Sequence, residues 1–141
     1  MMQAIKRIEV DGNDGAGKSF RIQIIKKMFP NVEVVDRGLF SKYTLDEYYP
    51  RLNGDESHLK RAAEFRHIVR EESADTLFII LDCPISVCQD RIMKRGDSLD
   101  TEFHSEDALA KYEWRFRRLY KLVEDCPNVI IIDANRQLID L

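Results

Sequence analysis

The sequence predicts an α/β fold, a three-layer arrangement in which a parallel sheet of about four strands is flanked by helices on both faces. Short β-branched and apolar runs alternate along the chain with longer stretches whose apolar residues recur at helical spacing. No linker, repeat or low-complexity tract interrupts this alternation. The chain has 141 residues, 44% of them hydrophobic, which is enough for one core. We therefore expect a single domain over residues 1–141.

A glycine-rich loop follows the first apolar run. Residues 12–19 read Gly-Asn-Asp-Gly-Ala-Gly-Lys-Ser, which fits the phosphate-loop pattern of two glycines bracketing four residues and followed by Lys and Ser. Glycines let the backbone approach a phosphate chain closely and point several N–H groups at it. Lys18 would then reach the β- and γ-phosphates, and the Ser19 hydroxyl would ligate magnesium. The pattern predicts a site for ATP and Mg²⁺.

The segments beside the loop supply the strand and the helix that the pattern requires. Residues 4–10, before the loop, are expected to form a buried strand. Apolar residues after the loop predict a helix over residues 18–28: Phe20, Ile22, Ile24, Ile25 and Met28. This helix should end at Phe29, because Pro30 disfavours helical torsions in the residue before it.

The next strand is expected over residues 32–36, a short β-branched run. Its carboxyl end would present Asp36 and Arg37 at the edge of the sheet where ligands bind in open α/β folds. Residues 38–53 show no clean period. We expect a loop there, with room for one short helix, bordering the pocket for a second substrate.

The second half of the chain continues the alternation. We expect helices over residues 56–72, 85–94 and 106–124, and strands over residues 76–81 and 129–133, the last of them buried. In the helix over 85–94, Val87, Ile92 and Met93 should point inward. Residues 97–105 are polar and are expected to form a loop.

Composition narrows the class of protein. The formal net charge of -3 argues against a surface built to hold nucleic acid and favours a small ligand. The cysteines Cys83, Cys88 and Cys126 lack metal-ligand spacing and are interpreted as reduced thiols. No apolar run has the length of a membrane span, and the N-terminus lacks the form of a signal peptide. We expect a cytoplasmic protein without a membrane partner.

Four stretches of the chain carry a resemblance to the nucleoside monophosphate kinases of the thymidylate kinase family, a branch of the P-loop NTPases. Ile8–Ser19 is similar to the family's first strand and phosphate loop, and Asp36–Ser41 resembles its Asp-Arg-aromatic motif followed by a serine. Residues 81–96 resemble the strand, helix and entrance of the lid, and residues 132–134 resemble the end of the last strand, beside the base. The chain looks like a shortened member of this family.

On the donor side, the resemblance implies that ATP lies along the phosphate loop. The ATP-binding residues would be Gly12, Asn13, Asp14, Gly15, Ala16, Gly17, Lys18, Ser19 and Phe20. Arg95, just before Gly96, would lie by the adenine at the start of a lid around residues 95–105. Arg95 and Arg91 are the nearest candidates to stabilise the transition state, with Lys18 as the catalytic lysine.

On the acceptor side, the resemblance implies that Asp14 contacts the sugar hydroxyl and that Asp36 lies near magnesium and the acceptor. Arg37 would hold the acceptor phosphate, and Ser41 would belong to the same site. The family also has a longer segment before its Asp-Arg strand, with a helix that grips the base. A second alignment equates residues 32–37 with a strand of that segment and residues 59–65 with the helix.

The resemblance implies transfer of the ATP γ-phosphoryl group to the phosphate of a (deoxy)nucleoside monophosphate. The expected partner is this small nucleotide, and a homodimer is one oligomeric state that the resemblance allows. Two alternatives stay open. One is a kinase for the 5′-hydroxyl of a deoxynucleoside or polynucleotide, in which Asp36 would serve as base. The other is a nucleotide-binding regulatory protein that has lost turnover.

Overall fold

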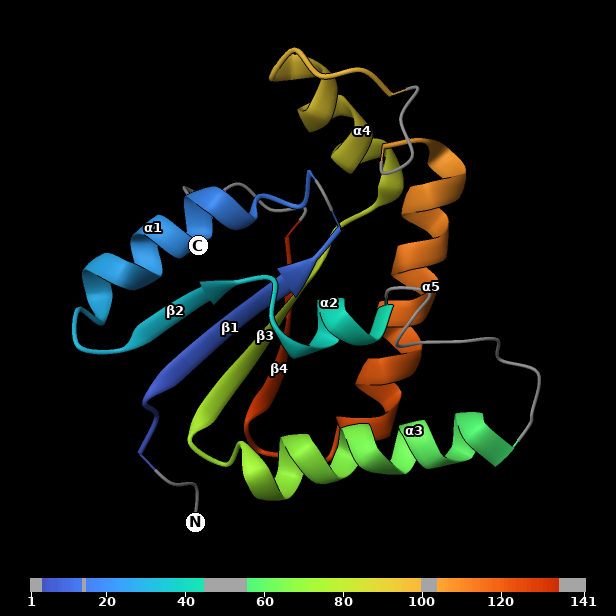
Figure 1. The fold of residues 1–141 in the computed structure, drawn as a ribbon. Coiled ribbons are helices and arrows are strands. Elements are labelled where there is room, and N and C mark those ends of the chain that lie inside the picture. The colour runs from blue at the N-terminus through green and yellow to red at the C-terminus, as the bar shows by residue number, and fades with distance from the viewer. Residues whose placement is uncertain (1–3, 14, 45–55, 100–103, 135–141) are drawn as a thin grey trace.

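The protein is built on a four-stranded parallel sheet in the order β2-β1-β3-β4 (Figure 1). The computed structural model describes residues 4–13, 15–44, 56–99 and 104–134, without the side chains of 56–59. The strands are β1 (Arg7–Gly12), β2 (Glu33–Asp36), β3 (Thr76–Asp82) and β4 (Val129–Asp133). This arrangement confirms the predicted α/β fold with a small parallel sheet.

Helices cover both faces of the sheet (Figure 1). They are α1 (Lys18–Met28), α2 (Leu39–Thr44), α3 (Glu56–His67) with the π-turn η1 (Ile68–Glu72), α4 (Ile85–Lys94) and α5 (Glu106–Val123). Successive side chains of β3 point to opposite faces of the sheet. Phe78 and Ile80 pack with α2, α3 and α5, whereas Ile79 and Leu81 pack with α1 and α4. In the part of the chain that the structure describes, no helix is long and apolar enough to cross a membrane.

Local chemistry explains where the helices begin and end. Helix α1 has the predicted bounds, and the N–H of Phe29 closes it by donating to the carbonyl of Ile25 just before Pro30. Helix α5 begins at Ser105, whose hydroxyl accepts a hydrogen bond of 3.2 Å from the N–H of Ala108. Such a cap satisfies one of the free N–H groups of the first turn.

Some apolar residues that the periodicity placed inside are exposed. Met93 is 54% exposed, so the prediction that it points inward is wrong. It follows the fully buried Ile92 by one residue, and successive helical positions face directions about 100° apart. The prediction of a buried last strand is also wrong in part, because Ile130 and Ile131 are 38% and 40% exposed. Among the described residues, strand β4 lies at the edge of the sheet and pairs with β3 alone.

Two segments show how the less regular parts of the sequence fold. The stretch over residues 38–53, expected as a loop with room for one short helix, contains helix α2, and residues 45–53 lie outside the described ranges. The predicted helix over 56–72 widens into the π-turn η1, in which the N–H of Ser73 donates to the carbonyl of Ile68. The side-chain amide of Asn128 then donates to the carbonyls of Val69, Ser73 and Thr76, at 3.1 Å each, and fixes the turn into β3.

Because the sheet is parallel, the carboxyl ends of all four strands lie along the same edge of the sheet, the one that runs across the strand ends. Val10 pairs with Asp36 across β1 and β2, and Gly12 pairs with Leu81 across β1 and β3. The glycine-rich loop after β1 therefore lies between the ends of β2 and β3. As predicted, Asp36 and Arg37 come to the same edge as this loop.

Candidate nucleotide-binding site

The glycine-rich loop is held in its shape by backbone torsions and by close packing. Gly15 and Gly17 have φ values of 80° and 85°, in the left-handed region that favours glycine. A Cβ on Gly15 would lie 2.3 Å from the carbonyl oxygen of Cys88 in α4. Larger residues at this position would push the loop off α4, so glycine is required there for two separate reasons.

Helix α1 presents its N-terminus to the loop. Gly17 is the N-cap, no side chain caps it, and the first turn contains no acidic residue. Uncapped N–H groups and the positive end of the helix dipole are the features that bind phosphate. Ser19 is exposed in this first turn, and Phe20, expected beside ATP, is 59% exposed. Asp14 lies outside the described residues.

Lys18 lies against the backbone of the loop. Its side chain is buried, and its ammonium nitrogen donates to the carbonyls of Gly12 at 3.2 Å and Asn13 at 3.1 Å. The two carbonyl oxygens hold the ammonium group within the loop. The role of Lys18 at the β- and γ-phosphates stays a prediction.

Two arginines brace the loop from helices α1 and α4. Arg91 donates to the carbonyl of Gly15 at 3.3 Å and to the carbonyl of Ala134, just after β4, at 3.0 Å. Arg21 donates to the carbonyl of Ala16 at 3.5 Å, and burial, followed by the charge of Arg91, lowers the pKa of Arg21. Arg91 thus ties the loop to the last strand, and a role at the transition state would require it to leave these carbonyls.

The turn after β2 places Arg37 in an unusual conformation. Arg37 has φ 63°, which is uncommon for a residue with a side chain, and its N–H donates to the carbonyl of Val10 at 3.0 Å. Its side chain is exposed and lines a cleft beside the phosphate loop. Asp36, also exposed, is not among the residues that line this cleft. Strained backbone of this kind concentrates at functional sites.

The carboxylates that build this turn come from β1, and the sequence reasoning missed them. Asp11 is fully buried and accepts hydrogen bonds from the N–H of Gly38, at 3.1 and 3.3 Å, and from the hydroxyl of Ser41. Glu9 accepts from the N–H of Leu39 at 2.6 Å. Two acids at alternate positions of an otherwise apolar strand were the available signal, because buried carboxylates need partners.

Burial is the main reason that the pKa of Asp11 rises to about 6. The hydrogen bond from Ser41 opposes the rise, the charge of Glu9 adds to it, and the Gly38 N–H and Lys18 oppose it. Ser41, expected in the acceptor site, contacts both Asp11 and the cleft. Its hydroxyl binds Asp11, and it also lines the cleft.

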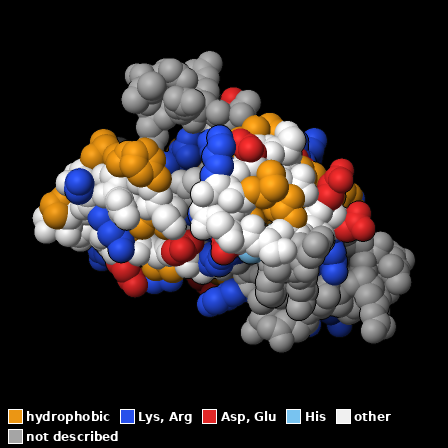
Figure 2. Space-filling model, turned by 90° about the horizontal axis from the view of Figure 1, so that it is seen from above, with side chains coloured by type: hydrophobic (Ala, Val, Ile, Leu, Met, Phe, Trp, Pro, Cys, Tyr) orange, Lys and Arg blue, Asp and Glu red, His pale blue; other side chains and the backbone are white. Residues whose placement is uncertain are grey.

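The cleft has a volume of about 480 Å³ and lies between the loop, α2 and α5. It is lined by Gly12, Asn13, Arg37, Gly38, Ser41, Lys42, Thr44, His104, Tyr112 and Phe116. Tyr112 and Phe116 come from α5. Arg115 of the same helix donates to the carbonyl of Thr44 and so ties α5 to α2. Figure 2 views this end of the molecule and shows Lys and Arg side chains grouped between apolar ones.

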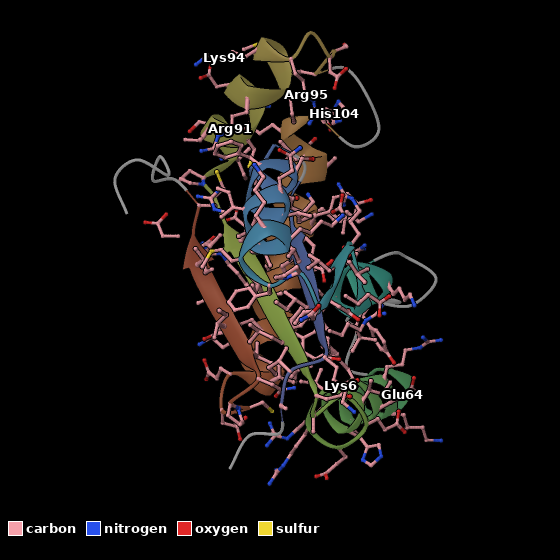
Figure 3. All side chains as sticks on the ribbon, turned by 90° about the vertical axis from the view of Figure 1, so that its left-hand side faces the viewer. Lys6, Glu64, Arg91, Lys94, Arg95 and His104 are labelled. Carbon is pink, nitrogen blue, oxygen red and sulfur yellow. The ribbon has the colours of Figure 1, made fainter. Side chains whose placement is uncertain are left out.

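The predicted lid begins with Arg95, at the end of α4. Arg95 pairs with Asp97, and one of its terminal nitrogens lies 3.4 Å from Nε2 of His104. Figure 3 shows Arg91, Arg95 and His104 at one end of the molecule, with Lys6 and Glu64 at the other. Residues 100–103 of the predicted lid lie outside the described ranges.

The donor set fits magnesium that is held mainly by phosphates. Among the described residues, no group of three or more His, Cys, Asp or Glu side chains could hold a metal ion. Magnesium in kinase sites needs one or two protein ligands, with substrate phosphates and water completing its shell. The exposed Ser19 hydroxyl in the first turn of α1 meets this requirement.

No family model matches the sequence, and no curated protein matches it. Solved structures of deoxyadenosine kinase from M. mycoides do resemble this chain. The structure with bound dCTP has a TM-score of 0.64 at 17% identity and covers 95% of this chain and 93% of that chain. The structure with bound dATP has a TM-score of 0.59 at 18% identity and covers 96% and 94%.

A third structure of that enzyme, with products dCMP and a flexible dCDP bound, has a TM-score of 0.56 at 18% identity. At such identities the likeness concerns the fold. It confirms the resemblance to kinases at the level of a P-loop nucleoside kinase fold, whereas the thymidylate kinase family itself stays a prediction. The chain has an α/β fold like that of a P-loop deoxynucleoside kinase, with the glycine-rich loop in its first β–α connection.

Proposed function

We propose that this protein is a kinase that transfers the γ-phosphoryl group of ATP to the phosphate of a (deoxy)nucleoside monophosphate. One observation carries the proposal. The phosphate loop, with buried Lys18, borders a cleft of about 480 Å³ whose described lining has cationic and aromatic side chains but no carboxylate. Such a lining suits an acceptor that is itself an anion attached to a flat base.

On the donor side, the proposed chemistry is positioning and neutralisation of charge. The loop N–H groups and the start of α1 bind the triphosphate, and Lys18 moves from the carbonyls of Gly12 and Asn13 to the phosphate oxygens. Ser19 would hold magnesium, with Asp36 near it, and the bound metal supplies further charge neutralisation at the β- and γ-phosphates. Arg95, with Arg91, screens the charge that develops as the lid closes.

On the acceptor side, Arg37 aligns the acceptor phosphate through its planar fork of N–H groups. Ser41 and Asp14 take part in holding the acceptor, and the aromatic rings of Tyr112 and Phe116 offer faces for the base. A phosphate oxygen is already a nucleophile, so this reaction has no need of a strong general base. The absence of a carboxylate from the described lining is consistent with that requirement.

A second candidate is a deoxynucleoside kinase, which phosphorylates a 5′-hydroxyl. The fold likeness to deoxyadenosine kinase favours it. A hydroxyl acceptor needs a base, for which the sequence suggests Asp36. The structure offers Asp11 as well, because its partner Ser41 reaches the cleft and its pKa lies near 6. A nucleotide-binding protein without turnover is the third candidate.

A panel of acceptors separates the three candidates. The full chain is incubated with Mg-ATP and, in parallel, with nucleosides, nucleoside monophosphates and 5′-hydroxyl oligonucleotides, and ADP formation is followed. We expect ADP to form with monophosphates, with deoxy forms among them. Turnover on nucleosides alone would favour the second candidate and exclude the first. Binding of ATP without turnover on any acceptor would exclude both kinases.

A further inference from the structure

Two cysteines lie together against the phosphate loop, on the side of the sheet covered by α1 and α4. Cys83 directly follows β3, and Cys88 belongs to α4. Both are buried, and the Sγ of Cys88 donates to the carbonyl of Cys83 over 3.8 Å. The carbonyl of Cys88 is also the group that leaves no space for a Cβ on Gly15. The backbone of this cysteine pair therefore touches the loop directly.

The surroundings favour a thiolate on one of the two cysteines. Arg91 donates to the Sγ of Cys83 at 3.5 Å with the same nitrogen that donates to the carbonyl of Gly15. A hydrogen bond from the Cys88 thiol, and then the charges of Arg91 and Arg21, hold the pKa of Cys83 below its ordinary value, against burial and Asp133. The same hydrogen bond and burial raise the pKa of Cys88. A thiolate beside a thiol is the arrangement from which disulfides form.

The third cysteine provides an internal comparison. Cys126 is buried in the other core, next to α5 and β4. Burial and the charge of Asp125 raise its pKa, with Arg66 and Arg70 opposing. It has neither a cysteine neighbour nor a hydrogen-bonded arginine among the contacts described. Thiols of this kind are inert because the neutral form is a poor nucleophile.

We propose that Cys83 and Cys88 form an oxidation site, at which a peroxide such as H₂O₂ converts the two thiols to a disulfide that weakens nucleotide binding at the adjoining phosphate loop. The Cys83 thiolate attacks one peroxide oxygen, the O–O bond breaks, and the released hydroxide takes a proton to leave as water, with a sulfenic acid on Cys83. The Cys88 sulfur then attacks the Cys83 sulfur, the S–O bond breaks, and a second water leaves with the Cys88 proton. The two thiols lose two electrons in total, and H₂O₂ gains them.

The geometry links this oxidation to the loop. Cys83 loses the negative charge that faces Arg91, and Cys88 moves toward Cys83 with the carbonyl that packs on Gly15. Both changes alter groups that brace the loop. The effect on nucleotide binding rests on the proposed function, whereas disulfide formation itself does not depend on it.

The chemical part of the proposal is tested by peptide mapping of the reduced full chain after treatment with H₂O₂. Trypsin leaves Cys83 and Cys88 in one peptide, Glu71–Arg91, and Cys126 in another, so the internal control is read in the same digest. We expect the first peptide to lose two hydrogens and to resist alkylation, while the Cys126 peptide still alkylates after denaturation. Oxidation of Cys126 at the same rate, or no change in either peptide, would overturn the proposal.

Three serine variants assign the roles of the thiols. Cys88→Ser should stop at the sulfenic acid, which dimedone traps on Cys83. Cys83→Ser should leave Cys88 unoxidised, and Cys126→Ser should behave as the wild type. Trapping on Cys88 in the Cys83→Ser variant, at the wild-type rate, would contradict the assignment of Cys83 as the attacking thiol.

The functional part is tested by the affinity for ATP before and after oxidation, with dithiothreitol reversal. We expect Kd to rise about tenfold, equivalent to about 1.4 kcal/mol, and to recover on reduction. The Cys83→Ser variant, which forms neither the sulfenic acid nor the disulfide, should show no such reversible change. A disulfide without a change in Kd would overturn the link to the loop. If the reduced protein does not bind ATP, the proposed function fails, while the peptide map still decides whether the pair is oxidised.

Discussion

The two sides of the site differ in how they are built. On the proposed donor side, the glycine-rich loop packs against α4 and the end of β4: Gly15 touches Cys88, Arg91 ties the loop to Ala134, and Lys18 is buried. On the acceptor side, an open cleft of about 480 Å³ is bordered by the exposed side chain of Arg37. The donor side is set by local backbone geometry, whereas the acceptor side is assembled from β1, the turn after β2, α2 and α5.

This difference has a consequence for substitutions. Changes on the donor side should affect both the fold and the binding of ATP, because the same groups serve packing and phosphate recognition. Changes on the acceptor side should affect the use of the acceptor and leave the loop intact.

Replacement of Lys18 by Met, which keeps the buried stem, should lower the rate of phosphoryl transfer by about 10²–10³-fold, because a preorganised charge at the γ-phosphate is lost. The measurement is kcat with the best acceptor from the panel. Lys27→Ala, on the exposed face of the same helix, is the matched control and should leave kcat unchanged. A loss of only a few-fold in Lys18→Met would contradict the role of this ammonium.

Gly15→Ala should lower the free energy of unfolding by about 2–5 kcal/mol, the sum of overpacking and left-handed strain. Gly96→Ala is its matched control, because Gly96 has a similar φ of 91° but nothing within 4 Å of an added Cβ. This control should cost about 1–2 kcal/mol. Urea unfolding measures both variants, and equal losses would show that contact with Cys88 is not what restricts Gly15.

Asp11 should make stability depend on pH between about 4 and 7. Its pKa is about 6 in the folded chain and 3.8 ordinarily, so the folded state binds more protons in this range. Stability is therefore higher at the acid end and falls as pH rises, by up to about 3 kcal/mol for this group. The loss is complete above the folded pKa.

The measurement compares the wild type with Asp11→Asn by urea unfolding at several pH values. The variant lacks the titrating group, so the stability of the wild type relative to the variant should decrease from pH 4 to pH 7. Parallel profiles for the two proteins would rule out a raised pKa at Asp11.

Loss of the Arg37 guanidinium should reduce kcat/KM for the acceptor by about 10–100-fold, the value of one charge-assisted contact of about 1.5–3 kcal/mol. Asn is the preferred replacement, because it tolerates the positive φ at this position. The KM for ATP should stay unchanged. Arg70→Ala, an exposed arginine of η1, serves as control. An equal loss for ATP and acceptor would remove Arg37 from the acceptor site.

Much of the fold could be predicted because hydrophobic periodicity distinguishes helices from strands and indicates their bounds. The bounds of α1 and α4 agree with the prediction, and β4 was found at its expected residues. Periodicity does not report how far a helix or strand is covered by its neighbours. This is why the exposure of Met93 and of Ile131 in β4 was not foreseen.

The glycine-rich loop could be predicted from eight residues because its pattern depends on local torsions and on the order of side chains along one turn. The sequence by itself therefore determined the α/β class and the arrival of Arg37 at the same edge of the sheet as the glycine-rich loop, and it predicted the donor site. Tertiary structure alone decided that Asp11 would support the turn after Arg37, that Tyr112 would line the cleft, and that Arg91 would brace the loop. These contacts join residues far apart in the chain, and such distances are set by packing, which no local pattern encodes.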